Sequence, residues 1–166
     1  DLWNLKLSKS NINFTSLSVN DFALRNIELN AHSEKDSMYV SGSIIANQPY
    51  PIDLNFVSIL SLSPEQELNV NIHNLSGKIG TTPIKNSDDI LFQYGEKTTL
   101  KVDDLKIGDG FINATAQFAK QEMSATAKLD TLPLHVLPDF FPDSFKDAAI
   151  SGLINLSGSS IKPLLK

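Results

Sequence analysis

The chain has 166 residues, 41% of them hydrophobic and 20% charged, with a formal net charge of −5. The absence of cysteine excludes a disulfide framework and a thiolate metal site. The basic residues are scattered and form no phosphate-binding stripe, so we expect no nucleic-acid partner. This length suits one core or one segment of a longer protein. Because the chain begins with Asp1 rather than Met, we expect a processed chain or an excised segment.

Apolar and polar residues alternate along most of the chain. A two-residue period places apolar side chains on one face of a strand and polar ones on the other, which is typical of half-buried β-strands. In chain order, the alternation predicts strands near residues 5–7, 12–19, 27–31, 38–44, 52–62, 68–72, 90–94, 102–107, 112–118, 123–129 and 149–156. The sequence therefore predicts an all-β fold of about ten to fourteen short antiparallel strands in a meander.

Polar breaks, several with glycine or proline, separate these segments. Turns are predicted at residues 8–11, 32–37, 47–51, 95–97, 108–110 and 119–122, a short turn or one helical turn at 21–24, and the longest irregular stretch at 77–89. The apolar positions change parity at Phe56 and Val57, which predicts a β-bulge or a bend because a one-residue slip turns side chains to the other face. Ser63 is the predicted cap of a turn over 63–66.

The pattern changes after residue 129. The segment 132–146 contains Pro133, Pro138 and Pro142 and shows no sustained alternation. We expect one short helix near 139–148, with aromatic residues that fold back onto the sheet as a plug. The strand pattern returns at Ala149.

A faint internal repeat appears at a spacing of about 72 residues. The segments 27–54 and 105–127 both run strand, polar turn, strand with a small residue at its middle, turn, strand. We therefore expect one segment, 1–166, of a longer repeat protein, with loose units at about 1–98 and 99–166. Such repeats favour an elongated array over a closed sandwich, because each unit buries its apolar face only against its neighbours.

No catalytic or metal-binding constellation stands out. His32, His73 and His135 lie far apart and lack the spacing of a zinc site. The acidic pairs at 88–89 and 103–104 lack the alternate-position ligands of a calcium loop. No nucleophile or nucleotide-binding motif is present. We expect a protein that is not an enzyme and that has no cofactor and no metal.

The C-terminal third carries a more specific pattern. A leucine–proline–leucine run is followed by a leucine, a proline, a glycine-bounded strand and a closing proline. These positions are Leu132, Pro133, Leu134, Leu137, Pro142, Gly152, Gly158 and Pro163. The pattern resembles the repeating signature of the TamB family and of the wider AsmA-like group of bacterial envelope proteins, in which Gly152, Gly158 and Pro163 would be turn residues between repeats. The resemblance covers residues 99–163, and 25–62 match loosely.

The resemblance implies a fold, a location and a function. Such proteins are anchored in the inner membrane, span the periplasm of Gram-negative bacteria, and form a long folded-over β-sheet, or β-taco, with a hydrophobic groove. They act with an outer-membrane partner of the Omp85 type in phospholipid transport and in the assembly of outer-membrane β-barrels. This chain would be one inner segment of such a bridge, with phospholipid or nascent outer-membrane β-strands as its clients.

The alternating apolar residues are the candidate groove lining. An acyl chain needs an apolar, uncharged surface, and each methylene group removed from water contributes about 0.8 kcal/mol. The alternative is a β-sandwich adhesin or carbohydrate-binding module, in which the same residues would fill a closed core. The candidate groove residues are Ile27, Leu29, Val40, Ile44, Leu54, Phe56, Val70, Ile72, Phe92, Val102, Ile107, Phe118 and Leu129.

Overall fold

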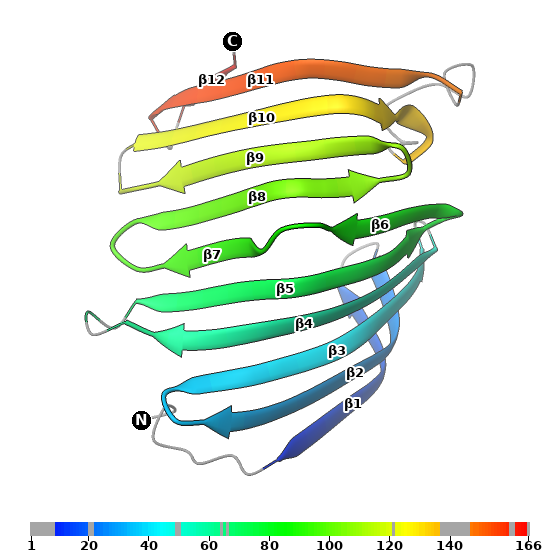
Figure 1. The fold of residues 1–166 in the computed structure, drawn as a ribbon, viewed down its shortest axis with the longest axis vertical. Coiled ribbons are helices and arrows are strands. Elements are labelled where there is room, and N and C mark those ends of the chain that lie inside the picture. Colours follow the sequence, from blue (N-terminus) through cyan, green and yellow to red (C-terminus); the bar gives the residue numbers. More distant parts are fainter. Residues whose placement is uncertain are drawn as a thin grey trace.

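A computed structural model describes residues 9–19, 22–48, 51–63, 65, 67–120, 122–136, 147–159 and 162–165. These residues form one antiparallel sheet of twelve strands (Figure 1). The strands are β1 (Ser10–Val19), β2 (Phe22–Glu34), β3 (Ser37–Gln48), β4 (Ile52–Leu62), β5 (Leu68–Ile79), β6 (Thr82–Asn86), β7 (Ile90–Tyr94), β8 (Thr98–Ile107), β9 (Gly110–Phe118), β10 (Glu122–Pro133), β11 (Ala149–Ser159) and β12 (Lys162–Leu165). A short 3-10 helix, η2 (Leu134–Val136), follows β10.

The strands follow one another across the sheet in chain order, so the predicted all-β antiparallel meander is confirmed. The one departure is that β6 and β7 share a single place between β5 and β8. Residues 87–89 interrupt this place, so β6 and β7 act as two halves of one strand. The described strands belong to one sheet, whereas the closed-core alternative requires two sheets packed face to face.

The register brings apolar residues of successive strands side by side. Directly paired residues of neighbouring strands lie on the same face of a sheet. One such row crosses seven strands and contains Leu60, Val70, Phe92, Leu100, Ala116, Ala125 and Leu156. The alternation within each strand and the pairing between strands therefore define an apolar face and an opposite polar face for the whole sheet.

Bulges keep the apolar residues on one face where the two-residue period fails. Val102 and Leu105 are three positions apart, yet both face the apolar side, because the register shifts between them. Asp104 takes a left-handed conformation with φ of 53°, and its amide donates to the Asn113 side chain across the bulge at 3.0 Å. Thr131 in β10 has the same role, and its amide donates to the hydroxyl of Ser151 at 2.8 Å.

The bulge predicted at Phe56 and Val57 is confirmed in position, because the register between β4 and β5 shifts at Val57 and Ser58. The extra residue, however, is His73 of β5. Strand β4 itself keeps its alternation, so Val57 lies on the polar face and Phe56 and Ser58 lie on the apolar face. The parity change in the sequence marks apolar residues on both faces of β4, not a bend of that strand.

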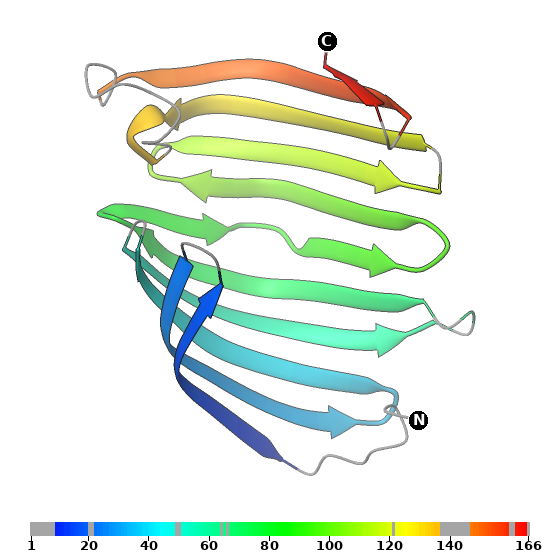
Figure 2. The same ribbon diagram turned by 180° about the vertical axis from the view of Figure 1, so that it is seen from behind.

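The sheet curls at its N-terminal end. The end of β1 and the start of β2 lie behind the sheet in Figure 1 and in front of it in Figure 2, so this part of the hairpin folds over one face. That face carries Ile27 and Ala46, both buried. A second buried cluster on the same face joins Ile84, Ile107 and Leu132. The apolar face is therefore covered in part by the curl of its own sheet.

Several predicted boundaries are wrong. Phe22, Ala23 and Leu24 belong to β2, and its strand runs on to Glu34, so the turn before β3 contains only Lys35 and Asp36. Ser10 and Asn11 belong to β1. The stretch 77–89 is mostly regular, because β5 reaches Ile79 and β6 follows directly. Ile84 anchors β6, since its side chain is buried against Ile107 of β8.

The remaining predictions have mixed outcomes. The Ser63 cap is confirmed, because its hydroxyl accepts the amides of Glu65 and Glu67 at 3.2 Å. The expected strand at 5–7 and residues 139–146 of the expected helix near 139–148 lie outside the described residues, and residues 147–148 are not helical. The expected unit boundary at 98–99 falls at the start of β8, and β7 pairs with β8 across it.

Candidate functional site: an open apolar sheet face

The register places all thirteen candidate residues on the apolar face. The chain of pairings runs from Ile27 and Leu29 in β2 to Leu129 in β10 without a change of side. The thirteen are Ile27, Leu29, Val40, Ile44, Leu54, Phe56, Val70, Ile72, Phe92, Val102, Ile107, Phe118 and Leu129. The sequence alone could not show that they share a face, because bulges lie between them.

The face has no charge among its described side chains. Between the named positions it carries further apolar or small residues that the sequence analysis did not select, among them Met38, Leu60, Leu100, Ala114, Ala116, Ala125, Ile154 and Leu156. The same alternation of apolar and polar residues marks these positions in the sequence. A continuous uncharged surface across the sheet is the result.

The face is only partly buried. Ile27, Val102 and Ile107 are buried, nine of the other candidates are half-buried, and Phe118 keeps 41% of its surface exposed. Ile12 and Phe14 on the edge strand β1 are exposed as well. Monomeric soluble proteins rarely leave large contiguous apolar surface open to water. The exposure therefore marks this face as a candidate binding surface.

The predicted repeat-signature residues lie within strands, not in turns. Gly152 and Gly158 belong to β11, and Pro163 belongs to β12. Gly158 pairs with Pro163 at the edge of the sheet. Proline is tolerated there because an edge strand has one side without a ladder partner. The prediction of turns at these positions is wrong, because all three residues belong to strands, and glycine and proline in a strand resemble a turn signal in the sequence.

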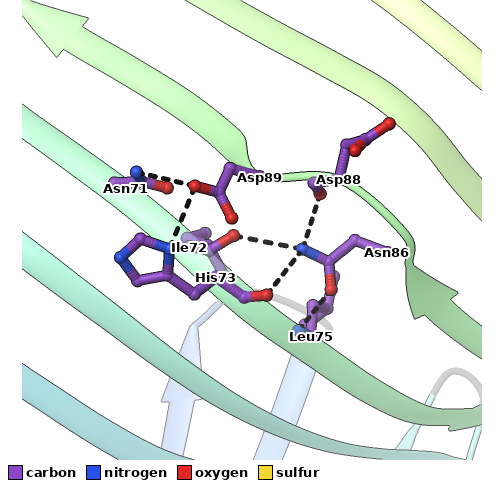
Figure 3. A network of polar contacts seen from close by, with 7 residues as sticks. All are labelled: Asn71, Ile72, His73, Leu75, Asn86, Asp88 and Asp89. Carbon is purple, nitrogen blue, oxygen red and sulfur yellow. Dashed lines mark hydrogen bonds and ion pairs between the residues drawn. The ribbon is translucent and has the colours of Figure 1, made fainter.

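The interruption between β6 and β7 is filled by side chains (Figure 3). The amide group of Asn86 accepts from the Leu75 amide at 2.6 Å and donates to the carbonyls of Ile72 and Asp88 at 3.1 and 2.9 Å. These bonds replace the backbone ladder that residues 87–89 cannot supply. Asn86 thus closes the sheet at the point where it would otherwise be open.

A second set of contacts lies beside it. Asp89 accepts from Asn71 and contacts the Nδ1 atom of His73, each at 3.0 Å, as Figure 3 shows. The hydrogen bond from Asn71, followed by that from His73, lowers the pKa of Asp89 below its ordinary value of 3.8. The Oδ1 atom of Asn71 is buried and has no hydrogen-bond partner. This network ties β5 to the start of β7.

The three histidines have separate partners. His32 stacks on Tyr39 with ring centroids 5.1 Å apart, His73 contacts Asp89, and the Nε2 atom of His135 lies 2.5 Å from the Thr82 hydroxyl. Among the described residues, no group of three or more acidic, histidine or cysteine side chains is arranged to hold a metal ion. No helix within the described ranges is long and apolar enough to cross a membrane.

Comparison with known proteins adds no relative. A scan against protein-family models, a search of curated proteins and a search of solved structures each give no match. The class that the fold defines is therefore a single curled antiparallel sheet with one open apolar face.

Proposed function

We propose that this chain is a segment of a TamB-like or AsmA-like bridge protein and that its apolar face shelters phospholipid acyl chains. The observation that carries the proposal is the gathering of thirteen alternating residues on one uncharged, partly exposed face. The location follows from the same proposal: the periplasm, as part of an inner-membrane-anchored protein with an Omp85-type outer-membrane partner.

The free energy gained by burying an acyl chain on this face is large enough for lipid binding. At about 0.8 kcal/mol for each methylene, ten methylenes against the face provide roughly 8 kcal/mol before the cost of association. No specific polar residue is needed, which agrees with a site that has no motif. The row from Leu60 to Leu156 also offers an uncharged path across the strands, so a chain can shift sideways without meeting a charge.

Nascent outer-membrane β-strands are the second client of the proposal, and the edge of the sheet favours them. Among the described strands, β1 lies at one end of the sheet order, and it contains no charge and no proline over Ser10–Val19. Natural edge strands are usually guarded by such residues, and an unguarded edge accepts another strand by β-augmentation. Ile12 and Phe14 would extend the apolar face to the added strand.

The test uses two residues of equal exposure on opposite faces. Phe118 on the apolar face and Leu91 on the polar face are each 41% exposed. The variants Phe118→Asp and Leu91→Asp are purified with phospholipid, and retained lipid is measured by native mass spectrometry. We expect Phe118→Asp to lose bound lipid and Leu91→Asp to keep it, with both variants folded by circular dichroism. Lipid retained equally by both folded variants would reject the proposal.

A further inference from the structure

The polar face has two shallow hollows that lie next to each other. One, of about 490 Å³, lies over β4, β5, β7 and β8, and the other, of about 370 Å³, lies over β8, β9 and β10. Thr99 and Lys101 line both. The two hollows therefore adjoin at these residues, on the side of the sheet opposite the proposed lipid surface, and together they are called the depression.

One cross-strand row of side chains runs along this depression. Its members are paired in succession across six strands, and each carries a neutral hydroxyl or amide group. They are Ser61, Asn69, Gln93, Thr99, Gln117 and Ser124. With neighbouring strands about 4.8 Å apart, five spacings give a row of roughly 24 Å. Such a length suits an extended ligand better than a small molecule.

The neighbouring cross-strand row contributes two apolar side chains to the larger hollow. Ile59 and Leu91 line the larger hollow on either side of Asn71, with which both are paired. Leu91 is 41% exposed, so its carbon surface is open to the hollow. The larger hollow therefore combines apolar carbon surface with amide and hydroxyl groups along its side.

Fixed charge is almost absent from the depression. Its lining contains two basic residues, and each has an acidic partner: Lys101 forms an ion pair with Asp103, and His73 contacts Asp89. The Gln93 amide donates to Glu67 at 2.5 Å, which leaves the carbonyl oxygen of Gln93 as an acceptor. A phosphate-bearing ligand would lack a free cation here, because phosphate contacts rely on lysine and arginine. The chemistry instead matches a neutral ligand rich in hydroxyl groups.

We propose that this depression binds a neutral oligosaccharide that lies across the strands. A sugar ring presents a carbon–hydrogen face, which fits Leu91, and a rim of hydroxyl groups that both donate and accept. The amide side chains of the row do the same, and the hydroxyls of Ser and Thr do so as well. The site is independent of the proposed lipid surface, because it occupies the other face of the sheet.

The test titrates the whole chain with two probes, the hexamer of N-acetylglucosamine and the hexamer of glucose, both β-1,4-linked, and follows binding by NMR. We expect saturable binding of at least one hexamer at millimolar concentration and weaker binding of its monomer. Gln117→Ala and Asn69→Ala should each weaken binding about threefold to tenfold, the loss expected for one net hydrogen bond.

The matched control is Asn55→Ala, which removes an exposed amide from the polar face of β4 outside both hollows. It should bind the hexamer as the unmodified chain does. Absence of binding for both hexamers would overturn the proposal. Unchanged affinity in the Gln117→Ala and Asn69→Ala double variant, or an equal loss of affinity in Asn55→Ala, would overturn it too.

Discussion

Replacing Leu132 is expected to have a large and measurable effect on the stability of the fold. Its side chain is 3% exposed and packs with Ile84 and Ile107, so it joins β10 to β6 and β8. Replacing it with alanine removes apolar contacts and leaves a cavity. Buried leucine-to-alanine changes typically cost about 2–5 kcal/mol. Because Leu132 is nearly inaccessible, we expect Leu132→Ala to fall in that range, out of a total stability of roughly 5–15 kcal/mol.

Leu91→Ala is the control for this prediction. Leu91 keeps 41% of its surface in water and lies on the opposite face, so the same change removes less buried surface and encloses no cavity. We expect a loss of about 1 kcal/mol or less. Urea unfolding followed by circular dichroism measures both values. An unchanged slope of the unfolding free energy against urea concentration checks that only the stability has changed. A loss below about 1 kcal/mol for Leu132→Ala, or equal losses for both variants, would refute the assigned core.

Three further predictions concern side-chain hydrogen bonds and closely packed glycines within the sheet. Asn86→Ala should lower the free energy of unfolding by about 1–3 kcal/mol, because the backbone amide of Leu75 in β5 loses its hydrogen-bond acceptor. Hydrogen exchange at the Leu75 amide should become faster, and unchanged exchange would contradict this. The hydrogen bond from Asn71 lowers the pKa of Asp89 below 3.8, so its carboxylate stabilises the fold above pH 3.8 and this contribution is lost as the pH falls through the lowered pKa. The Tm difference between the unmodified chain and Asp89→Asn should therefore shrink as the pH drops below 3.8, and a constant difference would disagree. Gly110→Ala should destabilise by about 1–3 kcal/mol, because its Cβ would lie 2.6 Å from a backbone oxygen of β10; Gly152→Ala, which meets nothing within 4 Å, should stay within about 0.5 kcal/mol in the same urea assay.

Most of the strands were predictable because alternation is a local property. The apolar residues of β3, β9 and β10 repeat every second position, and each of these strands lies within about four residues of its predicted place. Strand β6 was missed because the run Thr82–Asn86 contains a proline and only one large apolar residue. What makes it a strand is its pairing, with β5 across the tight turn at residues 80–81 and with β8, which is distant in the sequence.

The candidate site was predictable in its membership but not in its geometry. The choice of Val102, Ile107 and Leu129 followed from alternation, and the register places them together. That Val102 and Leu105 share a face depends on the left-handed Asp104, whose conformation the sequence does not reveal. The polar depression was not predicted at all, because hydroxyl and amide residues on an outer face carry no motif.

The central claim, that lipid contacts one face of the sheet, is tested most directly by photocrosslinking at adjacent positions of β10. The natural chain has no cysteine, so single cysteines can carry a benzophenone at Ala125 and Ala127 on the apolar face and at Ser124 and Thr126 on the polar face. The labelled chains are irradiated with phospholipid, and lipid adducts are counted by mass spectrometry. We predict adducts at Ala125 and Ala127 and background levels at Ser124 and Thr126. Equal labelling on both faces, or labelling confined to Ser124 and Thr126, would contradict the proposed function.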